Sequence, residues 1–391
     1  MPLSASLYPT VVLLGLGAQV ACGALLDWVG GDGPHWVRPG LGAGYVASFL
    51  VVVIAGFKGL RLLQSGQVTL RVERMGLRLV TGNAECVGFL PYNGILSLEI
   101  RRFPVPLWVA GSGFGLPWSI RLRDFADPED AHNLINEIRA RIGELPNGAT
   151  QLEGLDRRNA TGALVGTSWP KFSFAIVFVL ASIAALQLGL DAMEGESLMT
   201  LGANSGERML QGEFQRPWTA GLLHGSVLHI AVNSLWFLLV GFLLEPLLGV
   251  ARFALLIGLA SFAGCLVAAL ADPGQVGIGA SAGGMGAIGA WMGLHLWRRG
   301  ELPGSLRLTG ANLAAFLLML VAGDFVAVNT GHIAHLGGFL AGVVLVPILL
   351  GRTPLHELHQ RVPVALAAGA YLVGLTYLAA LVSILAAASN L

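Results

Sequence analysis

The sequence contains little charge. Only 12% of its 391 residues are charged, whereas 54% are hydrophobic, and the mean hydropathy is +0.70. A soluble globular chain carries about twice that charged fraction. Basic and acidic residues balance at 23 each, so no excess of positive charge points to a nucleic-acid partner. The composition therefore predicts a multi-span protein surrounded by membrane lipids, with no nucleic acid among its ligands.

Cysteine is also scarce. The three cysteines, Cys22, Cys86 and Cys265, lie far apart in dissimilar surroundings, and such a set predicts neither a disulfide framework nor a metal or redox motif. Residues 1–9 carry no basic side chain ahead of the first apolar run, which argues against a cleaved signal peptide. The glycine-rich stretches lack a Gly-Lys-Ser/Thr ending and do not indicate a phosphate loop. No cofactor is expected.

Apolar runs predict the membrane spans, because about 17–25 apolar residues are needed to cross a bilayer. Two runs, 11–26 and 41–57, predict a membrane hairpin within residues 1–64. Residues 169–352 contain six further runs, and residues 353–391 contain a linker and one more. These seven runs are 172–190, 224–244, 253–270, 281–297, 311–326, 332–350 and 364–387. The predicted fold class is an all-α polytopic membrane protein with seven spans in this part of the chain, or nine with the hairpin.

Residues 65–150 differ in character. Apolar and polar residues alternate at 68–72, 77–79, 96–100 and 118–122, as in half-buried strands. Asp127 and Pro128 then begin a helix with apolar residues at helical spacing. These patterns predict a small soluble α+β domain, similar to pleckstrin-homology modules, followed by a linker at 151–168. Because arginine outnumbers acidic residues between 68 and 123, a cytoplasmic partner or anionic lipid headgroups are expected here, with a solvated strand face as the alternative.

Basic residues predict one orientation for all the spans. If the spans alternate, the basic residues at their ends fall on a single side, which the positive-inside rule makes cytoplasmic. These residues are Lys58, Lys171, Arg252, Arg298, Arg299, Arg307, Arg352 and Arg361. Ser281 then lies near the opposite face. Abundant alanine, glycine and leucine with few lysines favour a bacterial inner membrane, with the site open to the periplasmic side.

Ser281 stands within the stretch of small residues 277–286. A lone serine in an apolar helix is usually unreactive, because its hydroxyl bonds to the carbonyls of its own helix. Ser281 follows a loop and opens an apolar run, so the N–H groups of the first helical turn are free beside it. A serine in that position can act as a nucleophile with its oxyanion donors in place. It needs a base from elsewhere in the chain.

Histidines supply the candidate bases. His229 and Asn233 are four residues apart and share one helix face, whereas His332 and His335 open the sixth core run. By alternation of the spans, Ser281, His229 and His335 all enter from the outer side and share a depth. Polar groups inside membrane spans are costly, and their default interpretation is functional.

Other interpretations exist for each of these residues. A single histidine in an apolar helix is more often a packing residue, and the pairs His224/His229 and His332/His335 could be metal ligands. A five-residue step turns a helix well away from one face, so metal binding ranks below nucleophilic catalysis. Asp324 could complete a triad, but an interfacial acid is favoured and it receives no catalytic role. Small residues four apart at 289/293 and 338/342 allow close approach of helices.

Several motifs, in order, resemble those of the rhomboid family of intramembrane serine proteases. The resemblance covers roughly residues 171–350 and rests on five stretches. They are Arg216-Pro217-Trp218-Thr219, His224…His229…Asn233, Glu245-Pro246-Leu247-Leu248-Gly249 with Arg252-Phe253, Gly279-Ala280-Ser281, and Ala334-His335-Leu336-Gly337-Gly338. The last of these matches the base motif of the family and selects His335 over His332.

The resemblance implies a Ser–His dyad within a six-helix core, with 364–387 as one extra C-terminal helix. Ser281 would attack the scissile carbonyl and His335 would take its proton, while the Ser281 N–H, His229 and Asn233 hold the oxyanion, with His224 and Gly279 in support. Substrates would be transmembrane proteins cut near the outer end of their membrane segment. The alternative is a catalytically inactive relative that binds membrane proteins and guides their handling. Three positions depart from the family pattern: Gln215, Ala282 and Met285.

Overall fold

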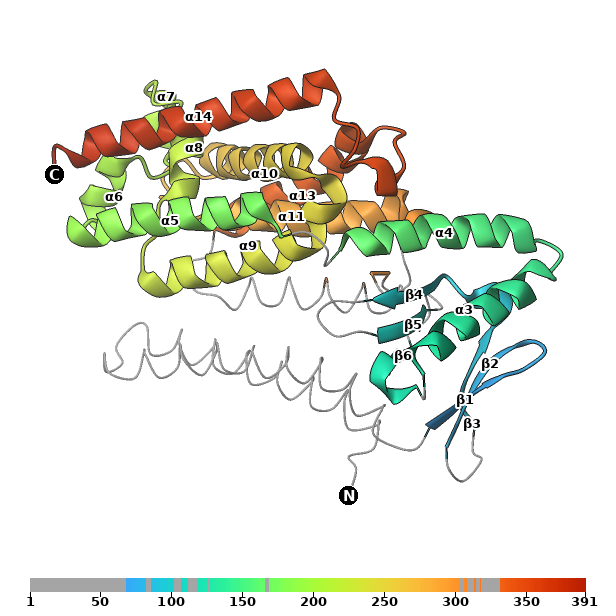
Figure 1. The fold of residues 1–391 in the computed structure, drawn as a ribbon. Helices are drawn as coiled ribbons and strands as arrows, with labels where there is room; N and C mark the ends of the chain where they lie inside the picture. The colour runs from blue at the N-terminus through green and yellow to red at the C-terminus, as the bar shows by residue number, and fades with distance from the viewer. Residues whose placement is uncertain are drawn as a thin grey trace. The chain divides into compact units, whose positions relative to one another are not determined.

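The computed structural model describes residues 68–81, 86–101, 107–111, 118–125, 127–165, 169–302, 306–307, 313, 317 and 331–391. The chain divides into two compact units, 1–159 with 303–330 and 160–302 with 331–391, whose elements are labelled in Figure 1. The predicted N-terminal hairpin lies outside the described residues. So does the predicted fifth core span, 311–326 with Asp324, apart from two isolated positions.

The described residues of the first unit form two antiparallel sheets of three strands each, in the orders β1-β2-β3 and β4-β5-β6. The strands are β1 (Val68–Val72), β2 (Gly76–Thr81), β3 (Cys86–Pro91), β4 (Ser97–Arg101), β5 (Leu107–Gly111) and β6 (Trp118–Arg121). Each stretch of predicted alternation coincides with part of a strand. The alternation buries one face, since Leu77, Leu98 and Trp108 are each no more than 2% exposed. The unit has its own apolar core.

Among the described residues, two helices follow the strands, although the sequence predicted one. α3 (Pro128–Gly143) begins with the expected cap, because the Asp127 carboxylate accepts a hydrogen bond from the Glu129 N–H. The segment predicted as a linker, 151–168, is helical up to Leu164 within α4 (Gly148–Leu164). Asn159 binds both backbone groups of Leu98 on β4. The weakly apolar sequence of α4 gave no helical signal, because its helix is stabilised by these tertiary contacts.

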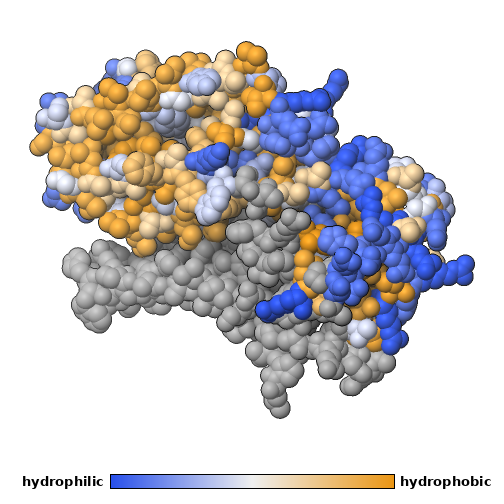
Figure 2. Space-filling view, viewed as in Figure 1, coloured by the Kyte–Doolittle hydropathy of each residue, from blue (hydrophilic) through white to orange (hydrophobic). Residues whose placement is uncertain are grey.

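The second unit is a bundle of apolar helices. Within the described part of the chain, five helices are long and apolar enough to cross a membrane: α5 (Lys171–Gly189), α9 (Val227–Leu248), α10 (Val250–Ala271), α13 (His332–Leu350) and α14 (Val364–Ala388). α11 (Ser281–Trp297) lies among them. Figure 2 shows that hydrophobic residues make up most of the visible face of this unit. All six coincide with predicted spans, and the chain is a multi-pass integral membrane protein.

The segment predicted only as polar, 191–216, contains short helices. They are α6 (Gly195–Leu201), α7 (Gly206–Leu210) and the start of α8 (Arg216–Thr219), which continues into a 3₁₀ turn at Ala220–Leu222. The run predicted from 224 begins as a helix only at Val227, because the Ser226 hydroxyl caps it by accepting from the His229 N–H.

α10 and the pair α11/α13 form the centre of the bundle. The most apolar stretch of α10 is 56% buried, against 28% for α5 and for α9, and α10 packs on α11, α13 and α14. The predicted small-residue positions bring α11 and α13 into backbone contact. A Cβ at Gly289 would collide with the carbonyl of Phe339, and one at Gly342 would collide with that of Gly286. Glycine at these positions therefore sets the separation of the two helices.

Buried polar side chains complete the helix ends. The carboxylate of Glu245, in the last turn of α9, accepts from the N–H groups of Phe172 and Ser173 and from the Ser173 hydroxyl at 2.8–2.9 Å. It thereby caps α5, whose own N-cap residue is a proline without a capping side chain. Arg252, at the start of α10, donates to the carbonyls of Leu349, Leu358 and Arg361. It satisfies carbonyls at the end of α13 and in the turn that follows.

An ion pair ties the end of α11 to the segment after α13. Arg298 lies 2.5 Å from Glu301, in the 3₁₀ turn Arg299–Glu301, and also donates to the carbonyl of Thr353 at 2.6 Å. Glu301 accepts from the N–H of Leu355 at 2.8 Å, in the 3₁₀ turn Leu355–Glu357. Burial raises the pKa of Glu301, but the hydrogen bonds from Arg298 and Leu355 outweigh it and hold this pKa below its ordinary 4.5.

The first prediction concerns the α11–α13 contact. Gly342→Ala places a methyl group against the Gly286 carbonyl, and overpacking of this kind costs about 1–3 kcal/mol. We expect a lower midpoint of unfolding in SDS. Gly369→Ala on α14 is the matched control, because its Cβ would lie 3.4 Å from Leu255, an ordinary contact. Alanine favours a helix over glycine by about 1 kcal/mol, so the control should be unchanged or more stable. Equal destabilisation by the two variants would contradict the contact.

The second prediction concerns acid. Since the folded pKa of Glu301 is lowered, its stabilising contribution is present above the ordinary carboxyl pKa and is lost as the pH falls through the lowered value. Glu301→Gln should therefore lose less stability between neutral and acidic pH than the wild type, measured by thermal unfolding. Glu357→Gln is the control, because Glu357 pairs with an Arg361 side chain that is 73% exposed, and exposed pairs contribute little. If Glu301→Gln loses as much stability on acidification as the wild type, the contribution assigned to Glu301 is wrong.

Candidate active site

Ser281 is the first residue of α11, directly after a loop held in place by backbone hydrogen bonds. Asn204 and Gly277 bond to each other through both backbone groups at 2.8 and 3.0 Å, and the Gly279 N–H donates to Ala220 at 2.9 Å. The Asn204 side chain also donates to the carbonyl of Cys265 on α10 at 2.7 Å. The loop thus delivers Ser281 to a helix N-terminus, where the backbone N–H groups have no intrahelical partner.

His335 lies in the first turn of α13, and its Nε2 is 2.6 Å from the Ser281 Oγ. Both side chains are partly buried. With the ring proton on Nδ1, Nε2 accepts the serine hydroxyl proton in this hydrogen bond. Two residues 54 positions apart meet because the glycines of α11 and α13 bring the beginnings of the two helices together. The geometry is that of a nucleophile and its base.

Gly279 forms the contact between the loop and α9. Its φ is +111°, a left-handed backbone conformation that side chains disfavour. A Cβ here would lie 2.7 Å from Cε1 and Nε2 of His229 and 3.6 Å from Nδ2 of Asn233. The predicted pair on α9 therefore faces the backbone two residues before Ser281. Asn233 is buried, and its Nδ2 has no hydrogen-bond partner in the described part of the chain. A buried donor left unpaired is costly unless a ligand completes it.

His224 lies behind His229 rather than beside Ser281. Its side chain is fully buried, and its ring packs edge-to-face on that of His229, with centroids 5.0 Å apart. Gln187 on α5 binds both backbone groups of His224 at 3.0 Å. His224 thus acts as a packing support for His229. Within the described ranges, no group of three or more His, Cys, Asp or Glu residues gathers as a metal site would require.

The motif that begins at Arg216 organises the chain before α9. Arg216 is 4% exposed, donates to the carbonyls of Met199 and Ala203 at 3.0 and 2.6 Å, and pairs with Glu213. The Thr219 hydroxyl donates to the carbonyl of Gly202. These bonds tie the short helices α6, α7 and α8 into the structure that supports Ala220, the partner of Gly279.

Sequence reasoning missed Gln187 and Asn204. Gln187 could have been found, because its amide interrupts the apolar run 172–190 and such an amide needs partners when buried. Asn204 lies in a polar segment where nothing distinguishes it from its neighbours. Its role follows only from its pairing with Gly277.

The departures from the family pattern are accommodated. The Ala282 side chain lies beside Gly264, and the Ala282 backbone lies so close to Gly338 that a Cβ there would collide with it, so a small residue suits position 282. Met285 is partly buried one turn after Ser281, and with Met285 present His335 still reaches the serine. Gln215 forms the N-cap position of α8 without a capping side-chain bond.

The fold and this site together define a class: a multi-pass helical membrane protein in which a serine, two histidines and an asparagine gather at the N-terminal ends of three helices. A sequence model of the Rhomboid domain matches residues 211–352, which contain all of these side chains. The chain belongs to the rhomboid family.

Proteins from distant organisms are similar to part of this chain. Rhomboid-like protease 3 of Toxoplasma gondii is 30% identical over 189 residues, which are 46% of this chain and 70% of that protein. Rhomboid protease GlpG of Pectobacterium atrosepticum is 34% identical over 155 residues, or 38% of this chain and 53% of that protein. Rhomboid protease GluP of Bacillus subtilis is 26% identical over 188 residues, 48% of this chain and only 36% of that protein.

The third prediction concerns Gly279. Gly279→Ala forces a side chain into a left-handed conformation and against the His229 ring, and strain of this kind costs about 1–3 kcal/mol. We expect a lower SDS unfolding midpoint. Gly277→Ala in the same loop is the control, because its Cβ would lie 3.6 Å from the Asn204 side chain and its φ is not left-handed. If both variants unfold at the wild-type midpoint, His229 does not lie against Gly279.

Proposed function

We propose that this protein is an intramembrane serine endopeptidase that acts through Ser281 and His335. The observation that carries the proposal is the 2.6 Å contact between the Ser281 Oγ and the His335 Nε2 at the beginning of a membrane helix. Relatives that bear the name protease support it. This chain spans about a third of the length of the Bacillus relative. The proposal therefore concerns the part of the chain that matches the Rhomboid domain, residues 211–352.

In the first step the Ser281 Oγ attacks the scissile carbonyl carbon while His335 Nε2 takes the hydroxyl proton. The carbonyl oxygen becomes an oxyanion, for which the Ser281 N–H, the His229 ring and the Asn233 amide are the donors at hand. Asn233 suits this role because its Nδ2 is buried and unpaired within the described structure. Losing one such donor typically costs about 2.7–4 kcal/mol of transition-state stabilisation.

In the second step the C–N bond breaks and the imidazolium of His335 returns its proton to the leaving amine. A water molecule then attacks the acyl-enzyme ester as His335 takes a proton from it. The ester bond breaks, Ser281 regains its hydroxyl proton from His335, and the new carboxyl terminus is released. His224 takes no part in proton transfer, because its place is behind His229.

The substrates we propose are transmembrane proteins cut near the outer end of their membrane segment. Ser281, His229 and His335 all lie in the first turns of their helices, so the reaction would occur near one face of the bilayer, where water is available. The positive-inside rule makes this face the non-cytoplasmic one, and the membrane proposed is a bacterial inner membrane.

The fourth prediction tests the dyad. Ser281→Ala should abolish labelling of the purified protein by a fluorophosphonate probe, as well as cleavage of a membrane-anchored reporter. His335→Ala should lower both rates by about 10²–10⁴-fold, the usual contribution of a general base. His332→Ala is the matched control, because it removes an imidazole from the same first turn of α13 and should leave labelling intact.

The alternative, a family member that binds membrane proteins without cutting them, gives a different result. It predicts no labelling of the folded wild-type protein in lipid vesicles. Labelling that persists in Ser281→Ala, or that depends on His332 instead of His335, would refute the assigned dyad.

A further inference from the structure

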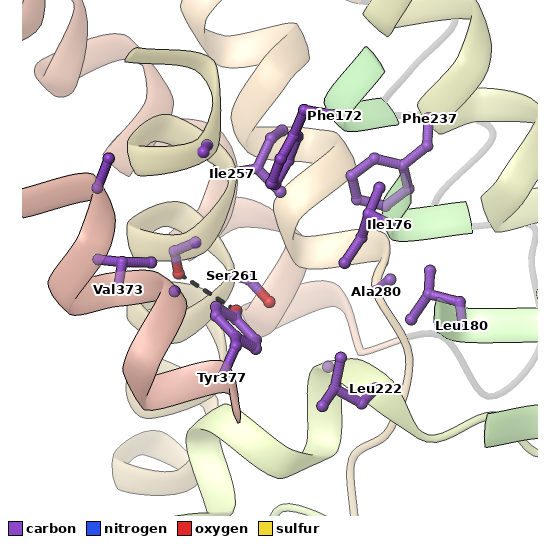
Figure 3. Close-up of a pocket in the computed structure, with 15 residues that line it drawn as sticks. Phe172, Ile176, Leu180, Leu222, Phe237, Ile257, Ser261, Ala280, Val373 and Tyr377 are labelled. Carbon is purple, nitrogen blue, oxygen red and sulfur yellow. Dashed lines mark hydrogen bonds between the residues drawn. The ribbon is translucent and has the colours of Figure 1, made fainter. Parts of the chain in front are cut away.

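A cavity of about 150 Å³ lies in the second unit between α5, α10 and α14, and the mechanism above does not use it. Figure 3 shows the side chains around it. Ile176 and Leu180 form the α5 wall, and Val373 and Tyr377 form the α14 wall. α10 packs on both helices, so it lies between these walls.

Small residues create the hollow. Ala254, Gly258 and Ser261 line it from α10 at spacings of four and three, which place them on one helix face. On α14, Gly374 also lines the cavity and is itself exposed, so the cavity reaches the surface there. A Cβ at Gly374 would meet no described atom within 4 Å. The Cβ of a larger side chain at Gly374 would therefore meet no clash beside the opening.

The cavity ends at the loop that precedes Ser281. Ala280 and Leu222 line it, and both are no more than 5% exposed. Ala280 directly precedes Ser281. Leu222 ends the 3₁₀ turn that begins at Ala220, whose carbonyl holds the Gly279 N–H. A ligand in the cavity would thus contact Ala280 in the loop that positions the serine and Leu222 in the turn that holds this loop.

The chemistry of the lining selects an apolar ligand. Aliphatic and aromatic side chains and glycines make up nearly all of it, and Ser261 and Tyr377 bring the only hydroxyl groups among the residues that line it. The Tyr377 hydroxyl donates to the Gly258 carbonyl at 3.4 Å, as Figure 3 shows. Apolar cavities of this size stay free of water and take up small apolar molecules.

The surroundings identify the ligand. α5 and α14 are both long and apolar enough to cross a membrane, so the opening at Gly374 faces the hydrocarbon of the bilayer. The apolar matter present there at the highest concentration is lipid acyl chains. A volume of about 150 Å³ fits the end of one acyl chain and is too small for a folded segment or a sterol ring system.

We propose that this cavity binds the end of one acyl chain of a membrane lipid, and that the bound chain supports the Ser281 loop through Ala280 and Leu222. The binding stands on the cavity alone. The support of the Ser281 loop by the bound chain rests on the proposed function, because it makes the reactivity of the serine depend on lipid occupancy.

The experiment uses the full chain in vesicles of phosphatidylethanolamine, a fraction of which carries a diazirine near the end of one acyl chain. After illumination, mass spectrometry locates the attached lipid. We expect adducts at the buried residues Leu222, Ile257 or Ala280, in addition to the exposed helix faces. Gly374→Leu should remove the buried adducts by filling the opening. Ala379→Leu, at an exposed position of the same helix, should keep them.

Adducts confined to exposed residues, or buried adducts that persist in Gly374→Leu, would overturn the binding site. Ala254→Leu, which fills the cavity from the α10 side, serves as a second variant should Gly374→Leu fail to fold.

Fluorophosphonate labelling separates lipid binding from its effect on the reactivity of Ser281. We expect the probe to label Ser281 about fivefold more slowly in Gly374→Leu than in the wild type, which is the lower end of the usual coupling between two sites. We expect Ala379→Leu to be labelled at the wild-type rate. Normal labelling in a Gly374→Leu protein that has lost the buried adducts would refute the coupling and leave the dyad intact. If no variant labels, the proposed function fails, and the adducts still decide whether the lipid binds.

Discussion

The structure depends on the direct backbone contact between α11 and α13. Gly286 and Gly289 of α11 meet Gly342 and Phe339 of α13 with no side chain between them. In a bilayer no hydrophobic force drives helices together, because lipid is as apolar as leucine, so close van der Waals packing has to hold them. The same contact brings the N-terminal ends of the two helices together, and so places His335 against Ser281. Packing and chemistry therefore depend on the same glycines.

A second constraint is the satisfaction of backbone groups away from water. Glu245 caps the beginning of α5, Arg252 binds carbonyls at the end of α13 and after it, and Arg298 with Glu301 joins the end of α11 to the segment after α13. Glu245 and Arg252 bond chiefly to backbone groups of other elements, whereas Arg298 and Glu301 bond to each other and to backbone groups after α13. Unsatisfied groups are costly in a membrane, so these residues stabilise the frame while leaving Asn233 as a buried donor at the site.

The pattern of the sequence predicted much of this frame. Apolar runs located the five long helices and α11, and small residues four apart predicted the close helix pair. Alternation located strands in the first unit, whereas α4 was missed because its residues carry no apolar period and its stability comes from bonds to the Leu98 strand. Gln187 and Asn204 were missed for a similar reason, since their partners are backbone groups distant in the chain. The pleckstrin-homology likeness and a lipid or protein partner for 65–150 stay predictions.

What the sequence by itself determined is the inventory: the membrane spans, the family motifs, and Ser281, His335, His229 and Asn233 as a set. The spans follow from local composition, and the resemblance to the rhomboid family, carried by short motifs, selected these four side chains. Both signals are present in the chain whether or not it is folded. Only the tertiary structure decided that Ser281 and His335 lie 2.6 Å apart, that His224 packs behind His229, and that a cavity ends at Ala280. Distances between helices depend on how their surfaces interlock, and that is a property of the packed bundle rather than of any one segment.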